Sequence, residues 1–289
     1  MSSFHFISLL LVLVRVLASG ILFYQKSKGI GTETANNLLR LRSWWFIALI
    51  VIVSLTLEFY GAVLLGGLIV CLSIYELSKM AQVQKRFLFT VAGFFFLALI
   101  ISSFAPAVLL GVFLLSLSFY FLLRKKRRLP LLCLSVSLTA SFLLLPALFK
   151  NHGELQLKAL LLTLILLSSL NDVFQYVCGK VFGKRALAPK ISPKKTIEGA
   201  FGGVLLSSLL SMLLWPGLME VSYPKAFALG MAISMAGILG DLNISQLKRD
   251  LGCKDSGTMI PGHGGILDRV DSLSFTLPTF TCLLLGVQL

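Results

Sequence analysis

The sequence has few charged residues for its length. Asp, Glu, Lys and Arg make up 13% of the 289 residues, whereas 57% are hydrophobic. Soluble domains carry about 25% charged residues, so a water-soluble fold would have no place for so much apolar surface. The composition excludes an ordinary soluble globular protein and predicts one that is embedded in a bilayer.

Acidic residues are scarcer than basic ones. The chain has 12 Asp and Glu against 26 Lys and Arg, which gives a formal net charge of +14. In a membrane protein, loops held against anionic lipid explain such an excess, and we therefore expect no nucleic-acid partner. None of the five cysteines forms a C-x-x-C pair, which favours buried free thiols over a zinc or disulfide role.

Long apolar runs predict an all-α polytopic membrane bundle of about ten transmembrane helices. A spanning helix needs about 20 mostly apolar residues. The candidate spans are residues 4–24, 44–57, 60–78, 87–103, 105–123, 130–149, 156–176, 197–215, 225–241 and 272–289. The first run lacks a basic start and a small-residue cleavage site, which favours a retained span over a signal peptide. We expect about six spans in an N-terminal part, 1–150, and a C-terminal catalytic membrane part, 151–289.

Basic residues cluster in every second loop. Most of the 26 Lys and Arg residues follow the first, third, fifth, seventh and ninth predicted spans. Because Lys and Arg gather on the cytoplasmic side, these loops are predicted to face the cytoplasm and both termini to face outward. The protein is thus expected to be a multi-pass cell-membrane protein with two long polar stretches, 171–203 and 240–271, at its cytoplasmic face.

Seven of the 12 acidic residues lie in these two stretches. Asp241 ends the predicted ninth span, and Asp268 and Asp271 begin the tenth; they are three residues apart and share a helical face if the helix has started by then. Carboxylates at mid-membrane cost about 2.5–3.5 kcal/mol each, so they tend to mark function. Three converging carboxylates would suit Mg²⁺; the alternative is acids that favour a helix N-terminus. Asp172, at the end of the seventh span, is either a fourth carboxylate or a partner for a nearby lysine.

Cations accompany these acids. If the helix continues past Asp241, then Ser245, Lys248 and Arg249 follow four, seven and eight residues later, on its face. Polyphosphate transfer needs such a mixture, because a metal bridges the phosphate oxygens while Lys or Arg neutralises charge on the leaving group. We therefore interpret Lys248 and Arg249 as catalytic candidates.

A glycine-rich loop lies between these elements. Lys254 is expected to pair locally with Asp255, and a Pro-Gly-His-Gly-Gly run follows. Gly264 and Gly265 would let the backbone approach a ligand and direct N–H groups at an anion. For His263, contact with phosphate or a part in loop structure is favoured over a role as general base.

The other polar stretch has its own motif at the start of the eighth span. Ser192 or Thr196 can cap the helix, and Glu198 lies in its first turn. Lys194 and Lys195 can bind phosphate, or they can be solvated membrane anchors.

One ordered set of polar residues runs from Ser245 to Asp271 without a gap. Its members are Ser245, Lys248-Arg249, Lys254-Asp255, His263-Gly264-Gly265, Asp268-Arg269 and Asp271. This order resembles the signature of the CDP-diacylglycerol synthase (phosphatidate cytidylyltransferase) family, and the stretch ISPKKTIEG is similar to the other motif of that family. The resemblance covers roughly the C-terminal 120 residues; the N-terminal half matches only in hydropathy.

The resemblance implies a helical membrane enzyme that converts CTP and phosphatidate to CDP-diacylglycerol and pyrophosphate. It implies Mg²⁺ surrounded by Asp241, Asp268 and Asp271, a K⁺-like ion as a second candidate beside it, and the basic residues of the motif near the triphosphate. One departure is Ile244, where many members carry Glu. It suggests that the chain belongs to a side branch of the family. The identity of the lipid substrate therefore stays open, and an ether-linked phosphatidate is one candidate.

We expect the lipid phosphate to enter from the inner leaflet and attack the α-phosphorus of CTP, while Lys248, Arg249 and Lys254 stabilise the leaving pyrophosphate. The further candidate substrate contacts are Asp172, Ser192, Lys194, Lys195, Ser245, Asp255, His263, Gly264, Gly265 and Arg269. A CTP-dependent polyprenol kinase is an alternative and would release CDP. A transporter is another, but the acids lie at span ends and no repeat is visible. Monomer and homodimer both stay open.

Overall fold

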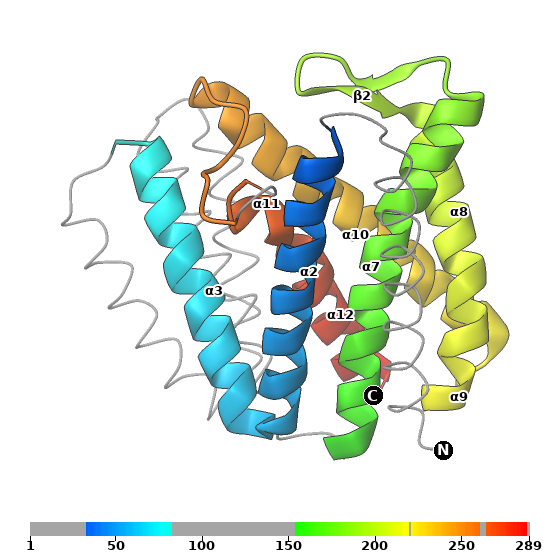
Figure 1. Ribbon diagram of the computed structural model, residues 1–289. Helices are drawn as coiled ribbons and strands as arrows, with labels where there is room; N and C mark the ends of the chain where they lie inside the picture. The colour runs from blue at the N-terminus through cyan, green and yellow to red at the C-terminus, as the bar shows by residue number, and fades with distance from the viewer. Residues whose placement is uncertain (1–32, 83–153, 220, 261–263, 288–289) are drawn as a thin grey trace.

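The computed structural model describes residues 33–82, 154–219, 221–260 and 264–287, and these residues are predominantly helical. The elements are α2 (Glu33–Thr56), α3 (Glu58–Met80), α7 (Glu154–Phe182), β1 (Ala186–Ala188), β2 (Ser192–Thr196), α8 (Ile197–Leu214), α9 (Pro216–Met219), α10 (Tyr223–Asp250), α11 (Leu267–Val270) and α12 (Leu273–Val287). The predicted helical class is confirmed in this part of the chain (Figure 1).

Three helices of the described residues are long and apolar enough to cross a membrane. They are Lys158–Phe182, Ile197–Leu214 and Tyr223–Asp250, and α2 contains a shorter apolar run, Trp45–Ser54. The spans predicted at 4–24, 87–103, 105–123 and 130–149 lie outside the described residues. The count of ten spans and the outward-facing termini stay predictions, as does the division at residue 150.

Helix α8 packs against both α7 and α10, and α12 packs on α10 (Figure 1). Small residues let them approach closely, as is usual for helices in lipid. A Cβ at Gly230 of α10 would lie only 2.2 Å from Ser211 Oγ of α8. The Ser211 hydroxyl donates to the Ala226 carbonyl of α10 at 2.6 Å. Four residues after Ser211, Trp215 packs on Phe280 of α12 with ring centroids 5.5 Å apart.

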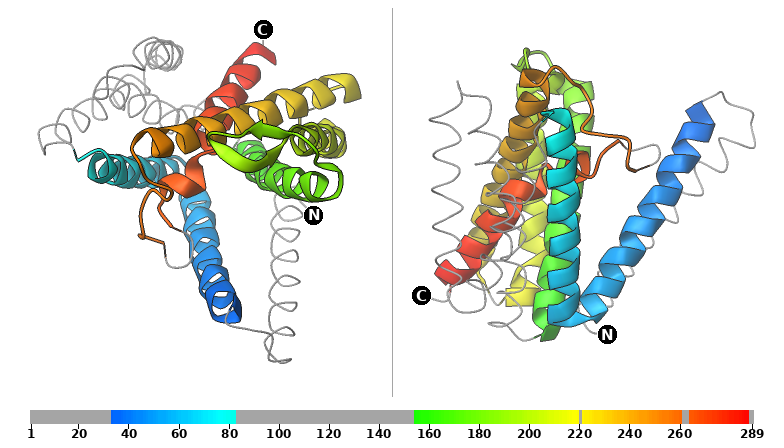
Figure 2. Two further views of the ribbon diagram at one scale, coloured as in Figure 1. Left: turned by 90° about the horizontal axis from the view of Figure 1, so that it is seen from above. Right: turned by 90° about the vertical axis from the view of Figure 1, so that its left-hand side faces the viewer.

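Helices α2 and α3 form a tight hairpin at the break predicted around Glu58 to Gly61. Only Leu57 separates the two helices, and a Cβ at Gly61 would lie 1.8 Å from the Ser54 carbonyl oxygen. The turn therefore requires glycine at this position. From the hairpin the two helices diverge in a V toward the end of the molecule that carries the polar loops (Figure 2).

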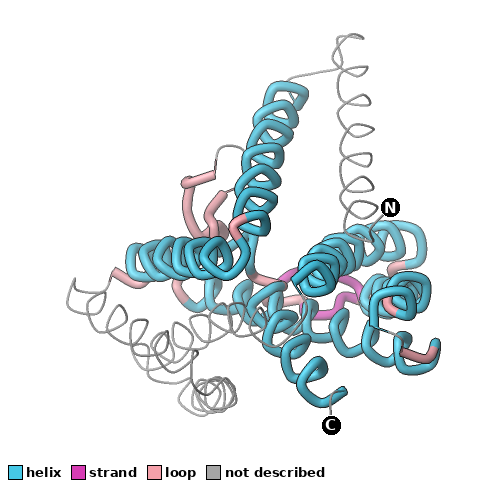
Figure 3. The backbone as a smooth tube through the Cα atoms, turned by 90° about the horizontal axis from the view of Figure 1, so that it is seen from below, coloured by secondary structure: helices cyan, strands magenta, loops and turns pink. Residues whose placement is uncertain are grey.

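A short β-hairpin is a departure from the all-α prediction. Strands β1 and β2 pair antiparallel, with Ala186 opposite Thr196 and Ala188 opposite Ser192; they are magenta in Figure 3. Thr196 ends the hairpin as the N-cap of α8, since its side chain accepts the Gly199 N–H at 3.1 Å. This hydrogen bond decides between the two predicted capping residues, because Ser192 lies at the other end of β2, away from the start of α8.

Candidate active site

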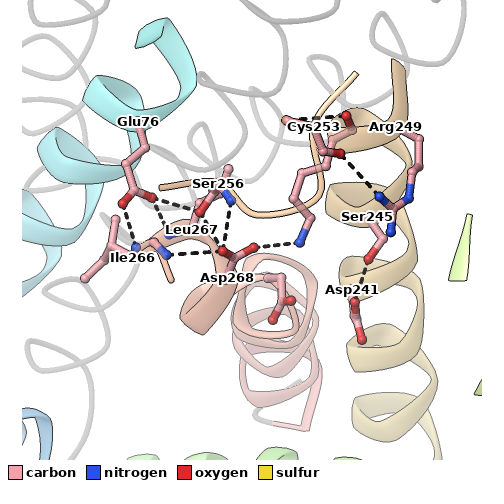
Figure 4. Close-up of polar contacts among 12 residues, drawn as sticks. Glu76, Asp241, Ser245, Arg249, Cys253, Ser256, Ile266, Leu267 and Asp268 are labelled. Atoms are coloured by element: carbon pink, nitrogen blue, oxygen red, sulfur yellow. Dashed lines mark hydrogen bonds and ion pairs between the residues drawn. The ribbon is translucent and has the colours of Figure 1, made fainter. Parts of the chain in front are cut away.

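Asp268 in α11 is held from both sides. Lys248 Nζ of α10 donates to Oδ1 at 2.6 Å. Oδ2 accepts the Ser256 N–H at 3.0 Å, the Ser256 hydroxyl at 2.9 Å and the Gly265 N–H at 3.2 Å (Figure 4). Partial burial alone would raise the pKa of Asp268, but the Lys248 ammonium and the N–H donors outweigh it and lower the pKa below its ordinary value. Asp268 is therefore an ionised, firmly oriented carboxylate.

Asp241 in α10 has a lysine partner of its own. Lys195 of β2 forms an ion pair with Oδ2, and the Ser245 hydroxyl donates to Oδ1 at 3.1 Å. The second contact confirms that Ser245 shares the helical face of Asp241. The β-hairpin thus contributes to the site, because it carries Lys195 to Asp241, which follows 46 residues later in the chain.

Asp271 lies beside Asp241 because α10 has a glycine at the preceding position. A Cβ at Gly240 would lie 2.5 Å from the Asp271 carbonyl oxygen, so the chain between α11 and α12 packs directly on the α10 backbone. Burial raises the pKa of Asp271 above its ordinary value, and the negative charges of Asp241 and Asp172 raise it further. Asp172 of α7 and Asp241 are therefore near enough to act on Asp271 through their charges.

The acids do not form a ready-made three-ligand cage. Within the described residues, no group of three His, Cys, Asp or Glu side chains is arranged to hold a metal ion, and Asp268 is turned toward Lys248. Mg²⁺ is usually bound by one or two carboxylates, with waters and substrate phosphates completing its shell. The carboxylates of Asp241 and Asp271 have the chemistry for such a partial site, and binding of Mg²⁺ by Asp241, Asp268 and Asp271 stays a prediction.

The remaining basic candidates are distributed around this centre. Arg249 is exposed, and it joins the β-hairpin to the loop after α10 by donating from Nε to the Ile191 carbonyl at 3.2 Å and from Nη1 to the Cys253 carbonyl at 3.4 Å. Lys194 is exposed on β2 and Ser192 is half-buried. Arg269 is exposed beside Asp172, where its charge acts on that carboxylate.

The local pair predicted between Lys254 and Asp255 is wrong. Both side chains are exposed, and no ion pair joins them in the part of the chain that the structure describes. The physical reason is that a fully solvated pair gains too little to hold two side chains in one geometry. Their predicted contact with substrate stays a prediction.

In the glycine-rich loop, each described glycine occupies a position where a side chain would be strained or would collide with a neighbour. Gly264 has φ +85°, which favours glycine, and its carbonyl accepts the Ile260 N–H at 2.9 Å. A Cβ at Gly265 would lie 2.0 Å from Ser256 Oγ. The anion that the Gly265 N–H contacts is the carboxylate of Asp268; contact with a phosphate stays a prediction. His263 lies outside the described residues.

Glu76 belongs to the same network, although the sequence analysis does not single it out. It is 3% exposed on α3 and accepts the backbone N–H groups of Ile266 and Leu267, each at 2.9 Å. The signal was present in the sequence, because an acid near the end of an apolar run tends to mark function.

An apolar cavity leads to the acids. It has a volume of about 810 Å³ and lies between α2, α3, α7 and the segment 259–273. Its apolar walls include Phe46, Ile50 and Val51 of α2 and Leu65, Leu68, Ile69 and Leu72 of α3. Asp172, Asp268, Arg269 and Asp271 line the same cavity. The cavity therefore joins a large apolar space to a charged region.

The sequence profile of the Cytidylyltransferase family matches residues 38–286. The chain belongs to the cytidylyltransferase family. Over 146 residues it is 43% identical to the uncharacterized protein YnbB of Escherichia coli (strain K12), which covers 50% of this chain and 48% of YnbB. The chain is also similar to proteins named phosphatidate cytidylyltransferase, with 45% identity over 117 residues in Staphylococcus epidermidis and 44% over 121 residues in Aquifex aeolicus.

The matches to the two phosphatidate cytidylyltransferases cover 40% and 42% of this chain and 45% of each relative. The chain thus spans about half the length of the curated relatives it matches. Family membership agrees with the resemblance drawn from the motif. At the departing position, Ile244 is completely buried in the apolar core, so this cytidylyltransferase has no acid there that could reach a substrate.

Proposed function

We propose that this protein is a phosphatidate cytidylyltransferase, which converts CTP and phosphatidate, or a related phosphorylated diradylglycerol, to CDP-diacylglycerol and pyrophosphate. The observation that carries the proposal is the cavity whose apolar walls end at Asp172, Asp268, Arg269 and Asp271. Its walls suit the hydrocarbon chains of a lipid. At its charged end, Arg269 and a cation held by the carboxylates would suit a phosphate group. Membership of the cytidylyltransferase family supports CTP as the second substrate.

The proposed reaction is an in-line displacement. An oxygen of the lipid phosphate attacks the α-phosphorus of CTP, the bond from that phosphorus to the bridging oxygen of the β-phosphate breaks, and pyrophosphate leaves with the electron pair. A phosphate monoester is already ionised near pH 7, so no general base is required. The contribution of the protein is to position the two phosphates and to neutralise their charge.

Two lysines lie where they could neutralise the charge of the phosphates. Lys195 pairs with Asp241 and Lys248 pairs with Asp268. We expect both ammonium groups to turn toward the phosphates when substrates bind, which would free carboxylate oxygens. Asp241 and Asp271, with Asp268 as a third candidate, would hold Mg²⁺, which supplies charge neutralisation at the phosphate oxygens when it is bound.

The proposal includes a place and an orientation. The lipid would enter sideways through the cavity between α2 and α3, and CTP would arrive from the cytoplasm at the end of the bundle that carries the polar loops. The clustering of Lys and Arg in alternate loops of the sequence supports this orientation. A multi-pass location in the cell membrane follows from the same reasoning.

The test is an assay of purified protein in detergent with CTP labelled in the α-phosphate. Ester-linked phosphatidate, ether-linked phosphatidate and a polyprenol serve as acceptors, each with Mg²⁺ and with excess chelator. The expected result is label in the lipid and one pyrophosphate per lipid product, in the presence of Mg²⁺ only. Release of CDP with an unlabelled lipid product would instead indicate γ-phosphate transfer and reject the proposal. The ester and ether arms identify the acceptor that the substitution at Ile244 leaves open.

A further inference from the structure

We infer that Glu76 of α3 is a positioning residue for the catalytic carboxylate Asp268, and that it fixes the distance between the lipid cavity wall and the site of nucleotidyl transfer. The inference rests on the proposed function and adds a residue from outside the C-terminal motifs. The observation behind it is that a buried side chain far from the motifs in sequence binds the segment that carries Asp268.

Glu76 uses both carboxylate oxygens on this segment. Oε1 accepts the Ile266 N–H at 2.9 Å and Oε2 accepts the Leu267 N–H at 2.9 Å. These are the two residues directly before Asp268, so the carboxylate fixes the backbone from which Asp268 projects (Figure 4). The partners are 190 and 191 residues apart in the chain, and neither amide could be held this way by its own sequence neighbourhood.

Ser256 connects the two carboxylates. Its hydroxyl lies 3.1 Å from Glu76 Oε2 and 2.9 Å from Asp268 Oδ2. A hydroxyl has one proton, so it can donate to only one of them at a time. Its backbone N–H adds a separate bond to Asp268 Oδ2 at 3.0 Å. A change at Glu76 therefore reaches Asp268 by two routes, through the backbone of 266–267 and through Ser256.

The surroundings leave no room for another arrangement. A Cβ at Gly265 would lie 2.4 and 2.6 Å from the Glu76 oxygens, and a Cβ at Gly257 would lie 2.9 Å from Oε1. Both positions therefore need glycine for the Glu76 carboxylate to approach the backbone this closely. This close fit indicates a defined position for the Asp268 segment.

The same helix also forms the wall of the lipid cavity. Leu65, Leu68, Ile69 and Leu72 of α3 line the cavity, and Glu76 follows Leu72 by one helical turn. Asp268 lines the cavity at its charged end. A lipid seated against α3 is therefore held at a fixed height relative to Asp268 by the Glu76 contacts, and this is what in-line attack requires.

The experiment compares wild type with Glu76→Gln, Glu76→Asp and Leu77→Ala, all purified in detergent. Glu76→Gln keeps the shape but has only one accepting oxygen, so one buried N–H would face an amide NH₂. Leu77→Ala is the matched control, because Leu77 is the next residue of α3, is 0% exposed and packs in the apolar core. Hydrogen exchange at the Ile266 and Leu267 amides and steady-state kinetics are measured for each variant.

In Glu76→Gln, we expect exchange at these two amides to become about tenfold faster or more, because bonds to a charged acceptor are lost. We expect kcat to fall about tenfold or more while KM for CTP and for lipid change less than about threefold, as for an interaction made in the transition state. Glu76→Asp, which retains both oxygens, recovers part of kcat. Leu77→Ala lowers the melting temperature but changes neither kcat nor exchange at 266–267.

Unchanged exchange in Glu76→Gln would overturn the positioning role whatever the enzyme activity. An equal loss of kcat in Leu77→Ala would show that general destabilisation is the cause, and would also overturn it. Faster exchange in a protein whose wild type does not consume CTP would retain the Glu76 contact with the Asp268 segment and reject the proposed function instead. The two failures are thus distinguishable.

Discussion

One carboxylate oxygen of Asp268 pairs with the Lys248 ammonium, and one carboxylate oxygen of Asp241 pairs with the Lys195 ammonium. The two lysines come from different elements, so charge balance at the site depends on the β-hairpin as well as on α10. At the residue scale, the site is therefore a set of paired charges that substrate phosphates could rearrange. Removal of one member of a pair should therefore affect the charge that remains.

The first prediction concerns the acid that accepts four donors. In Asp268→Asn, only one oxygen remains, and the amide nitrogen must face either Lys248 or the N–H groups of Ser256 and Gly265. We expect kcat/KM to fall by about two orders of magnitude or more, with normal membrane insertion. Asp250→Asn, an exposed acid at the end of α10, is the matched control and should remain fully active. Wild-type activity in Asp268→Asn would exclude this carboxylate from catalysis.

The second prediction concerns stability. The side chains of Lys248 and Asp268 are only 11% and 9% exposed. Lys248→Met leaves the Asp268 carboxylate without its cation, and such losses cost about 3–5 kcal/mol. We expect a lower melting temperature in detergent, and we expect the double variant Lys248→Met, Asp268→Asn to regain part of the loss. If the two single effects simply add, the pair is not coupled.

At the scale of secondary-structure elements, glycines decide how closely neighbouring elements approach each other. Gly240 lets the chain before α12 lie directly on α10, and Gly61 closes the α2–α3 hairpin. In the hairpin the glycine shapes the fold, whereas at α10 it also brings Asp241 next to Asp271. At Gly240, a single close contact therefore determines both how α10 packs and where the Asp271 segment lies.

The third prediction follows from this contact. A Cβ added by Gly240→Ala would lie 2.5 Å from the Asp271 carbonyl oxygen, so α10 and the Asp271 segment must separate. Overpacking of this kind costs about 1–3 kcal/mol, and we expect activity to fall about tenfold or more because the two acids move apart. Gly237→Ala is the control one turn earlier on α10, where the new Cβ would meet Asn171 Nδ2 at an ordinary 3.6 Å. Equal activity of the two variants would contradict the role given to Gly240.

For the molecule as a whole, the cavity joins the hairpin of α2 and α3 to the C-terminal motifs. The V of these helices opens toward the end of the molecule that carries the β-hairpin (Figure 2). The N-terminal helices therefore contribute the wall of the proposed lipid site, and through Glu76 they also contact the Asp268 segment. The same helix, α3, thus lines the proposed lipid site and contacts the Asp268 segment.

The fourth prediction tests the cavity. Ile69→Trp fills part of the space on α3 and should raise KM for the lipid about tenfold or more, while KM for CTP changes by less than about twofold. Leu64→Trp on the same helix is the control, since Leu64 is 66% exposed and does not line the cavity. Kinetics with short-chain phosphatidate in mixed micelles provide the measurement. An unchanged lipid KM in Ile69→Trp would place the lipid elsewhere.

The sequence by itself determined the membrane class, the helical character and the family, because hydropathy and an ordered polar motif are properties of the chain that do not depend on contacts. It also predicted that Ser245 lies on the face of Asp241, since helical periodicity is local. Only the tertiary structure decided which lysine pairs with which acid, and that Glu76 and Asp172 belong to the site. Those contacts join residues from separate elements of the chain, and their geometry is set by how the helices pack.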